Sequence, residues 1–144
     1  MKKILLVLMA IVTVFSVCAC SESTAEAKTV QEWFENNQEA IEAYCEKASS
    51  DTHTITLQAE ENTFVFSVKF TSLTEEELTE AQQGAVNDQQ KWNAKTAEEK
   101  QEHFETYVKT LEANGFEGMP MPDTLVTQLY DENNELVAST YFTK

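Results

Sequence analysis

The sequence contains no arginine. All ten basic residues are lysines, against 25 aspartates and glutamates, and the formal net charge is −15. Recognition of phosphates and nucleic acids depends on clusters of arginine and lysine, and the chain has no such cluster. The composition therefore excludes nucleic acid as a partner.

Cysteine and histidine are also scarce. The two histidines, His53 and His103, do not form an H-x-x-x-H pair, and the cysteines do not form a C-x-x-C pair. We therefore expect no metal site, no cofactor and no catalytic residue. Cys45 falls on the apolar side of a predicted helix, and we interpret it as a buried structural thiol rather than a nucleophile.

One long apolar run is present, from residue 4 to residue 17, and it is too short for a typical membrane span. Lys2 and Lys3 precede it. A positive start, a short apolar region and a small residue before a cysteine are typical of a bacterial lipoprotein signal peptide. In this interpretation residues 1–19 are removed, and Cys20 takes a diacylglyceryl group and becomes the new N-terminus. The lipobox residues before it are Val17, Cys18 and Ala19.

The alternative is an ordinary secretory signal that is cut nearby. Under the lipoprotein interpretation the formal charge falls from −15 to −17, because Lys2 and Lys3 are lost. Cys45 then has no partner for an intrachain disulfide. An acidic body is repelled by an anionic membrane surface, so the lipid on Cys20 would be the membrane contact. The expected location is the extracytoplasmic face of the cell membrane, with 20–28 as a flexible tether.

The segment 29–48 has the pattern of an amphipathic helix. Thr29 and Glu32 have the spacing of a capping box. The apolar residues recur at helical spacing on one side, and they are Val30, Trp33, Phe34, Ile41, Tyr44 and Cys45.

Alternation of period two predicts two β-hairpins. The first joins 53–59 to 64–70 through a short polar loop. The second joins 125–130 to 136–142. The phenylalanine-rich face of 64–70 is expected to pack against the first helix.

A long helical stretch, 74–114, separates the hairpins. A continuous helix of this length would extend about 60 Å, which is more than a small sheet can cover. Thr74 and Thr96 each begin a capping box. We therefore expect a break near Asn93–Thr96.

These elements follow the order α-β-β-α-β-β and predict an α+β fold over 29–144, as a single domain. The expected architecture is an antiparallel four-stranded sheet of two hairpins, packed with an N-terminal helix and a long second helix. The order of the strands stays open.

The same region resembles the small lipoproteins of Gram-positive, mostly clostridial, bacteria known as domain of unknown function 4854. The resemblance implies a shared fold and a surface location, and it implies no activity. Relatives usually have an Asp-Gly type of turn in the last hairpin, where this chain has Asn133-Asn134. The motifs that carry the resemblance are Val30-x-x-Trp33, the hairpin Ala59-Glu60-Glu61-Asn62-Thr63-Phe64, and the hairpin from Leu129-Tyr130-Asp131 to Leu136.

The leading functional hypothesis is a lipid-anchored binding or envelope-associated domain without catalysis. Its protein or peptide partner is expected on an exposed face or edge of the sheet. A small hydrolase with a site around His53 or His103 is one alternative. An inhibitor of an envelope enzyme with a protruding loop at Gly118–Pro122 is another, and a passive acidic surface component is a third. Met119 and Met121 are interpreted as contacts of that loop with the core.

Overall fold

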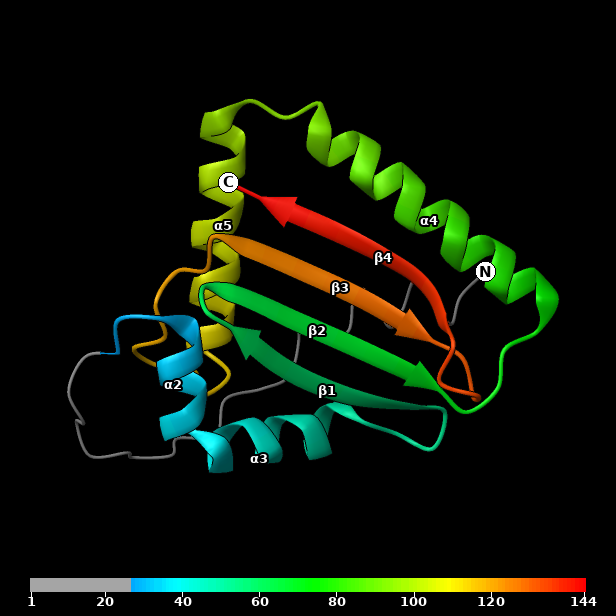
Figure 1. Ribbon diagram of the computed structural model, residues 1–144, viewed down its shortest axis with the longest axis horizontal. Coiled ribbons are helices and arrows are strands. Elements are labelled where there is room, and N and C mark those ends of the chain that lie inside the picture. Colours follow the sequence, from blue (N-terminus) through cyan, green and yellow to red (C-terminus); the bar gives the residue numbers. More distant parts are fainter. Residues whose placement is uncertain (1–26) are drawn as a thin grey trace.

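The computed structural model describes residues 27–144, in which the elements follow the order α-α-β-β-α-α-β-β (Figure 1). The helices within this range are α2 (Val30–Asn36), α3 (Gln38–Ala48), α4 (Glu75–Asn93) and α5 (Ala97–Glu112). The strands are β1 (His53–Glu60), β2 (Thr63–Phe70), β3 (Thr124–Tyr130) and β4 (Leu136–Thr143).

The sheet is mixed, so the expectation of an antiparallel sheet is wrong. Both predicted hairpins are present, because β1 pairs with β2 and β3 pairs with β4 in antiparallel fashion. The central pair, β2 and β3, is parallel, and the strand order is β1-β2-β3-β4. The helical connection between β2 and β3 returns the chain to the end of the sheet where β2 began, so Thr63 lies beside Thr124. Parallel strands need a long crossover of this kind.

The single helix predicted for 29–48 is also wrong, because α2 and α3 are separate helices. They meet at Asn37, whose φ of −127° and ψ of 34° lie outside the helical range. The Asn37 amide donates to the carbonyl of Trp33, and the Gln38 amide donates to the carbonyl of Phe34, each over 2.7 Å. These side chains occupy carbonyls that the backbone of a continuous helix would use.

The long helical stretch breaks where the sequence predicts. Helix α4 ends at Asn93 and α5 begins at Ala97. Thr96 is the N-cap of α5: its hydroxyl accepts from the N–H of Glu99, and the Glu99 carboxylate accepts from the N–H of Thr96. Thr74 and Glu77 make the same capping box at the start of α4. The break lets the two helices take different directions on the sheet (Figure 1).

The helices pack on one side of the sheet. Helix α3 follows β1, α4 follows β4, and α5 crosses near the start of β2 and β3 (Figure 1). The rings of Phe34 and Phe64 meet edge to face with centroids 5.4 Å apart, as expected for the first helical segment and the phenylalanine face of β2. Tyr107 of α5 also meets Phe64, at 6.0 Å.

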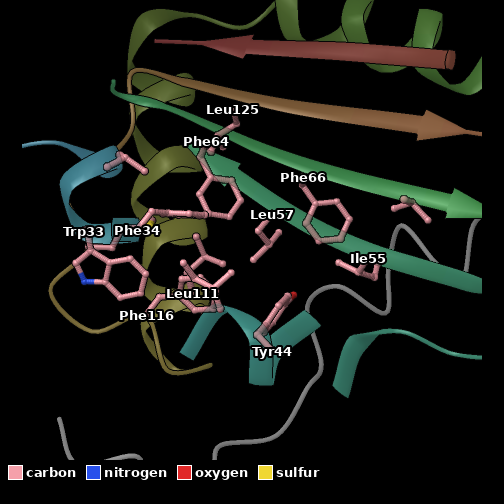
Figure 2. Close-up of a cluster of buried hydrophobic side chains, with 14 of the residues drawn as sticks. Trp33, Phe34, Tyr44, Ile55, Leu57, Phe64, Phe66, Leu111, Phe116 and Leu125 are labelled. Carbon is pink, nitrogen blue, oxygen red and sulfur yellow. The ribbon is translucent and has the colours of Figure 1, made fainter. Parts of the chain in front are cut away.

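Phe116, in the loop after α5, lies at the centre of the aromatic cluster (Figure 2). Its side chain is fully buried, with 0% exposure. It stacks on Trp33 at 5.2 Å and meets Tyr44 at 5.3 Å and Phe64 at 6.5 Å. A loop residue therefore joins α2, α3 and β2.

Candidate functional site

Within residues 27–144, no helix lies in front of the face of the sheet opposite the helices (Figure 1). Alternate residues of each strand point to this face, and the strand register places them in rows across the sheet. We call this surface the open face. Its rows are Glu60–Thr63–Thr124–Thr143, Gln58–Val65–Val126–Tyr141, Thr56–Ser67–Gln128–Ser139 and Thr54–Lys69–Tyr130.

Charge is sparse on the open face. Lys69 and Glu60, near opposite ends of the sheet, are the charged residues in its rows, although the chain carries 25 acidic residues. The interiors of protein interfaces are likewise poor in charge and rich in tyrosine. The open face therefore differs from the rest of this acidic protein in the way that an interface does.

The polar side chains at the middle of the open face form hydrogen bonds with one another. The side-chain oxygen of Gln128 accepts from the Ser67 hydroxyl over 3.2 Å and from the Tyr130 hydroxyl over 3.0 Å. Ser67 is buried, with 8% exposure, although it lies on the open face. A partner would thus meet an ordered surface, which lowers the entropy lost on binding.

The exposed large apolar side chains within residues 27–144 all lie on the β4 side of the molecule. They are Val86 of α4, exposed by 51%, and Leu136 and Tyr141 of β4, exposed by 52% and 51%. A hollow of about 400 Å³ lies between α4 and β4, with Val86, Val137 and Ser139 among its lining residues. The β4 side therefore extends the open face with apolar surface.

Two side chains of α4 form hydrogen bonds with backbone groups at the outer edge of β4. The Gln89 amide donates to the carbonyl of Tyr141 over 2.9 Å and accepts from its N–H over 2.8 Å. The Trp92 indole N–H donates to the carbonyl of Thr143 over 3.2 Å. An edge strand whose backbone groups are occupied does not add a further strand. A partner at this end of β4 would therefore contact side chains of the open face and not the backbone edge.

The residues considered as candidates for catalysis, Cys45 and His103, lie on separate helices. Cys45 is half-buried on α3, and its pKa is raised by burial, which outweighs the hydrogen bond from the N–H of Leu57. His103 is an exposed residue of α5, but one side of its ring lies against Trp92, and this partial burial lowers its pKa, with a smaller contribution from Lys95. A thiol whose pKa is raised and an imidazole whose pKa is lowered, on different helices, do not form a nucleophilic pair.

His53 begins β1, as predicted, and both of its ring nitrogens have partners. Its Nε2 lies 3.1 Å from the carbonyl of Ala48, and its Nδ1 lies 3.0 Å from the Ser50 hydroxyl. A carbonyl only accepts, so Nε2 donates to Ala48, while the Ser50 hydroxyl can donate to Nδ1 or accept from it. Both nitrogens thus hold the α3–β1 turn together. No group of three or more His, Cys, Asp or Glu side chains in the described range is placed to hold a metal ion.

The loop at Gly118–Pro122 folds onto the core. Met119 is 4% exposed and Pro122 is fully buried, while Met121 packs at the margin of the core. The Trp33 indole N–H donates to the carbonyl of Glu117 over 2.9 Å and fixes the start of the loop. The methionines therefore make the core contacts that the sequence predicts, and the protruding loop expected of an inhibitor is absent from this part of the chain.

The predicted anchor lies outside the described residues. This holds for the signal peptide, for Val17, Cys18 and Ala19 of the lipobox, for Cys20, and for the tether up to residue 26. From residue 27 onward, none of the helices has the length and apolar character needed to cross a membrane.

Comparison of the chain with protein-family models, with curated proteins and with solved structures found no match.

Proposed function

We propose that this chain is a lipid-anchored extracytoplasmic protein whose domain binds another protein, without catalysis, through the open face. One observation carries the proposal: a chain with 25 acidic residues places a single acidic residue, Glu60, and a single lysine, Lys69, on the rows of the open face. Aspartate and glutamate are among the residues depleted at interfaces because burying them is costly.

The anchor follows from the N-terminal pattern. Two acyl chains on Cys20 would bury many CH₂ groups at about 0.8 kcal/mol each, which suffices for stable attachment. The acidic domain is repelled by an anionic lipid surface, so the lipid on Cys20 would be its membrane contact. The resemblance to the clostridial lipoproteins with domain of unknown function 4854 agrees with this placement and adds no activity.

The size of the surface favours a protein partner that also covers the β4 side. Four strands spaced about 4.8 Å apart, with seven residues rising about 3.3 Å each, give a flat area of about 440 Å². A standard interface buries about 800 Å² on each partner. Val86 and Leu136 lie where the remaining contact area would be found.

A photocrosslinking amino acid at Tyr141 tests the proposal. The aromatic crosslinker p-benzoylphenylalanine replaces a half-exposed ring there, so the fold should be preserved. On intact cells of the native host, we expect it to yield one dominant adduct with another protein.

The matched control carries the same crosslinker at Thr106, an exposed residue of α5 on the helical side. We expect no such adduct from this position. The same adducts from both positions, or none from Tyr141, would refute binding through the open face. An adduct with glycan and not protein would refute the choice of partner.

A further inference from the structure

The opposite edge of the sheet, β1, is protected along part of its length. Residues 53, 55, 57 and 59 turn their backbone groups away from β2, as the alternation of an antiparallel pair requires. Both backbone groups of His53 bond to Ser50. The N–H of Ile55 donates to the Ser49 hydroxyl over 2.8 Å, and the N–H of Leu57 donates to the Cys45 thiol.

This protection is incomplete from the carbonyl of Leu57 onward. Within residues 27–144, no hydrogen bond reaches the outward N–H of Ala59 or the outward carbonyls of Leu57 and Ala59. These free groups match the backbone of an incoming extended chain, which is the requirement for strand addition.

The free backbone groups open into a hollow between β1 and the first two helices. Its volume is about 470 Å³, within the range of small ligand pockets. We call it the β1 groove. It is lined by Gln31, Phe34, Glu35, Gln38, Ile41, Leu57, Gln58, Ala59, Glu60 and Val65. The segment from Leu57 to Glu60 extends about 10 Å, which accommodates about three residues of an extended chain.

The negative charge of the β1 groove favours a basic ligand. Glu35 and Glu60 are exposed on opposite walls, and no lysine is among the lining residues. In the described part of the chain, neither carboxylate forms an ion pair. Phe34 and Ile41 supply apolar surface between them. A basic chain would gain two ion pairs there, whereas an acidic chain would be repelled.

We propose that the β1 groove binds a short extended peptide segment that carries lysine or arginine. Its backbone pairs with Ala59, and its basic side chains reach Glu35 and Glu60. The β1 groove lies at the edge of the sheet away from Tyr141, so this site does not depend on binding at the β4 side of the open face.

Fluorescence anisotropy with a labelled peptide tests the charge requirement. The full-length gene product, purified from membranes in non-ionic detergent, is titrated against fluorescein-Lys-Val-Lys-Val-Lys, with fluorescein-Glu-Val-Glu-Val-Glu as the acidic counterpart. We expect saturable binding of the basic peptide and none of the acidic one. The double variant Glu35→Gln/Glu60→Gln should raise Kd between about twofold and thirtyfold.

The control variant Glu105→Gln/Glu112→Gln removes the same charge from the exposed side of α5 and should leave Kd unchanged. An equal loss in both double variants would overturn the proposal, because it would indicate diffuse attraction to an acidic protein. Absence of binding to the basic peptide would overturn it as well.

Methylated peptides test the backbone pairing without altering the protein. N-methyl groups on alternate residues of an added strand either block the hydrogen bonds to β1 or point away from it. We therefore expect one of the two alternately methylated basic peptides to lose at least tenfold in affinity while the other binds. Hydrogen exchange at the Ala59 amide should slow in the complex. Equal affinities of the two peptides, or unchanged exchange at Ala59, would overturn strand addition.

Discussion

Replacement of Phe116 by alanine should lower the free energy of unfolding by about 3–5 kcal/mol. The ring is fully buried, and it touches Trp33, Tyr44 and Phe64, which come from three different elements. Its removal leaves a cavity that these elements can close only in part, because each is held by its own packing elsewhere in the core. A domain of this size has about 5–15 kcal/mol of stability, so the variant would lose a large part of it.

Urea unfolding followed by tryptophan fluorescence measures this loss, since Trp33 stacks directly on Phe116. Tyr141→Ala is the matched control, because it also removes an aromatic ring, from a site that is 51% exposed. We expect a cost below about 1 kcal/mol for the control. Similar losses in the two variants would contradict the central role given to the loop after α5.

Replacement of Cys20 by serine should abolish the attachment of lipid. A thioether to the diacylglyceryl group requires the thiol, so the hydroxyl of serine cannot substitute. In cells grown with radiolabelled palmitate, we expect label on the wild-type protein and none on Cys20→Ser. Extraction with Triton X-114 should move the wild type into the detergent phase.

The variant Cys45→Ser is the matched control for this experiment. It removes the other cysteine of the chain that follows residue 20, from a site on α3, and it should keep full labelling. Label that persists in Cys20→Ser, or is lost in Cys45→Ser, would show that the lipobox interpretation is wrong.

Local signals in the sequence predicted the local parts of the fold. The capping boxes at Thr74 and Thr96 gave the starts of α4 and α5, because each rests on two residues three positions apart. The two hairpins followed from alternation and short turns. In the second turn Asn134 takes a φ of 64°, a left-handed conformation that asparagine tolerates better than most residues.

The contacts between distant parts of the chain could not be predicted from the sequence. The parallel pairing of β2 with β3 depends on where two helices carry the chain, and no pattern within either strand records that direction. The break at Asn37 was missed because the apolar stripe continues across it, while side-chain bonds to the carbonyls of Trp33 and Phe34 interrupt the backbone pattern. Phe116 was missed because it lies between regular elements, where periodicity gives no signal.

The open face was partly visible in the sequence. The polar members of each strand alternation, such as Thr56, Ser67 and Gln128, are uncharged in a chain where acidic residues are frequent. The strand order was needed to show that they form continuous rows. The free backbone groups at Ala59 had no such signal, because they depend on which strand lies at the edge.

The central claim is that a partner protein covers the open face on the cell surface. Hydroxyl-radical footprinting on intact native cells tests this claim most directly. The rate of oxidation of Tyr141 is compared between the cell surface and the purified protein, with the exposed His103 of α5 as the internal reference. Our account predicts that Tyr141 is protected severalfold on cells while the rate at His103 is unchanged. Equal rates at Tyr141 in the two settings, or protection of His103 alone, would contradict it.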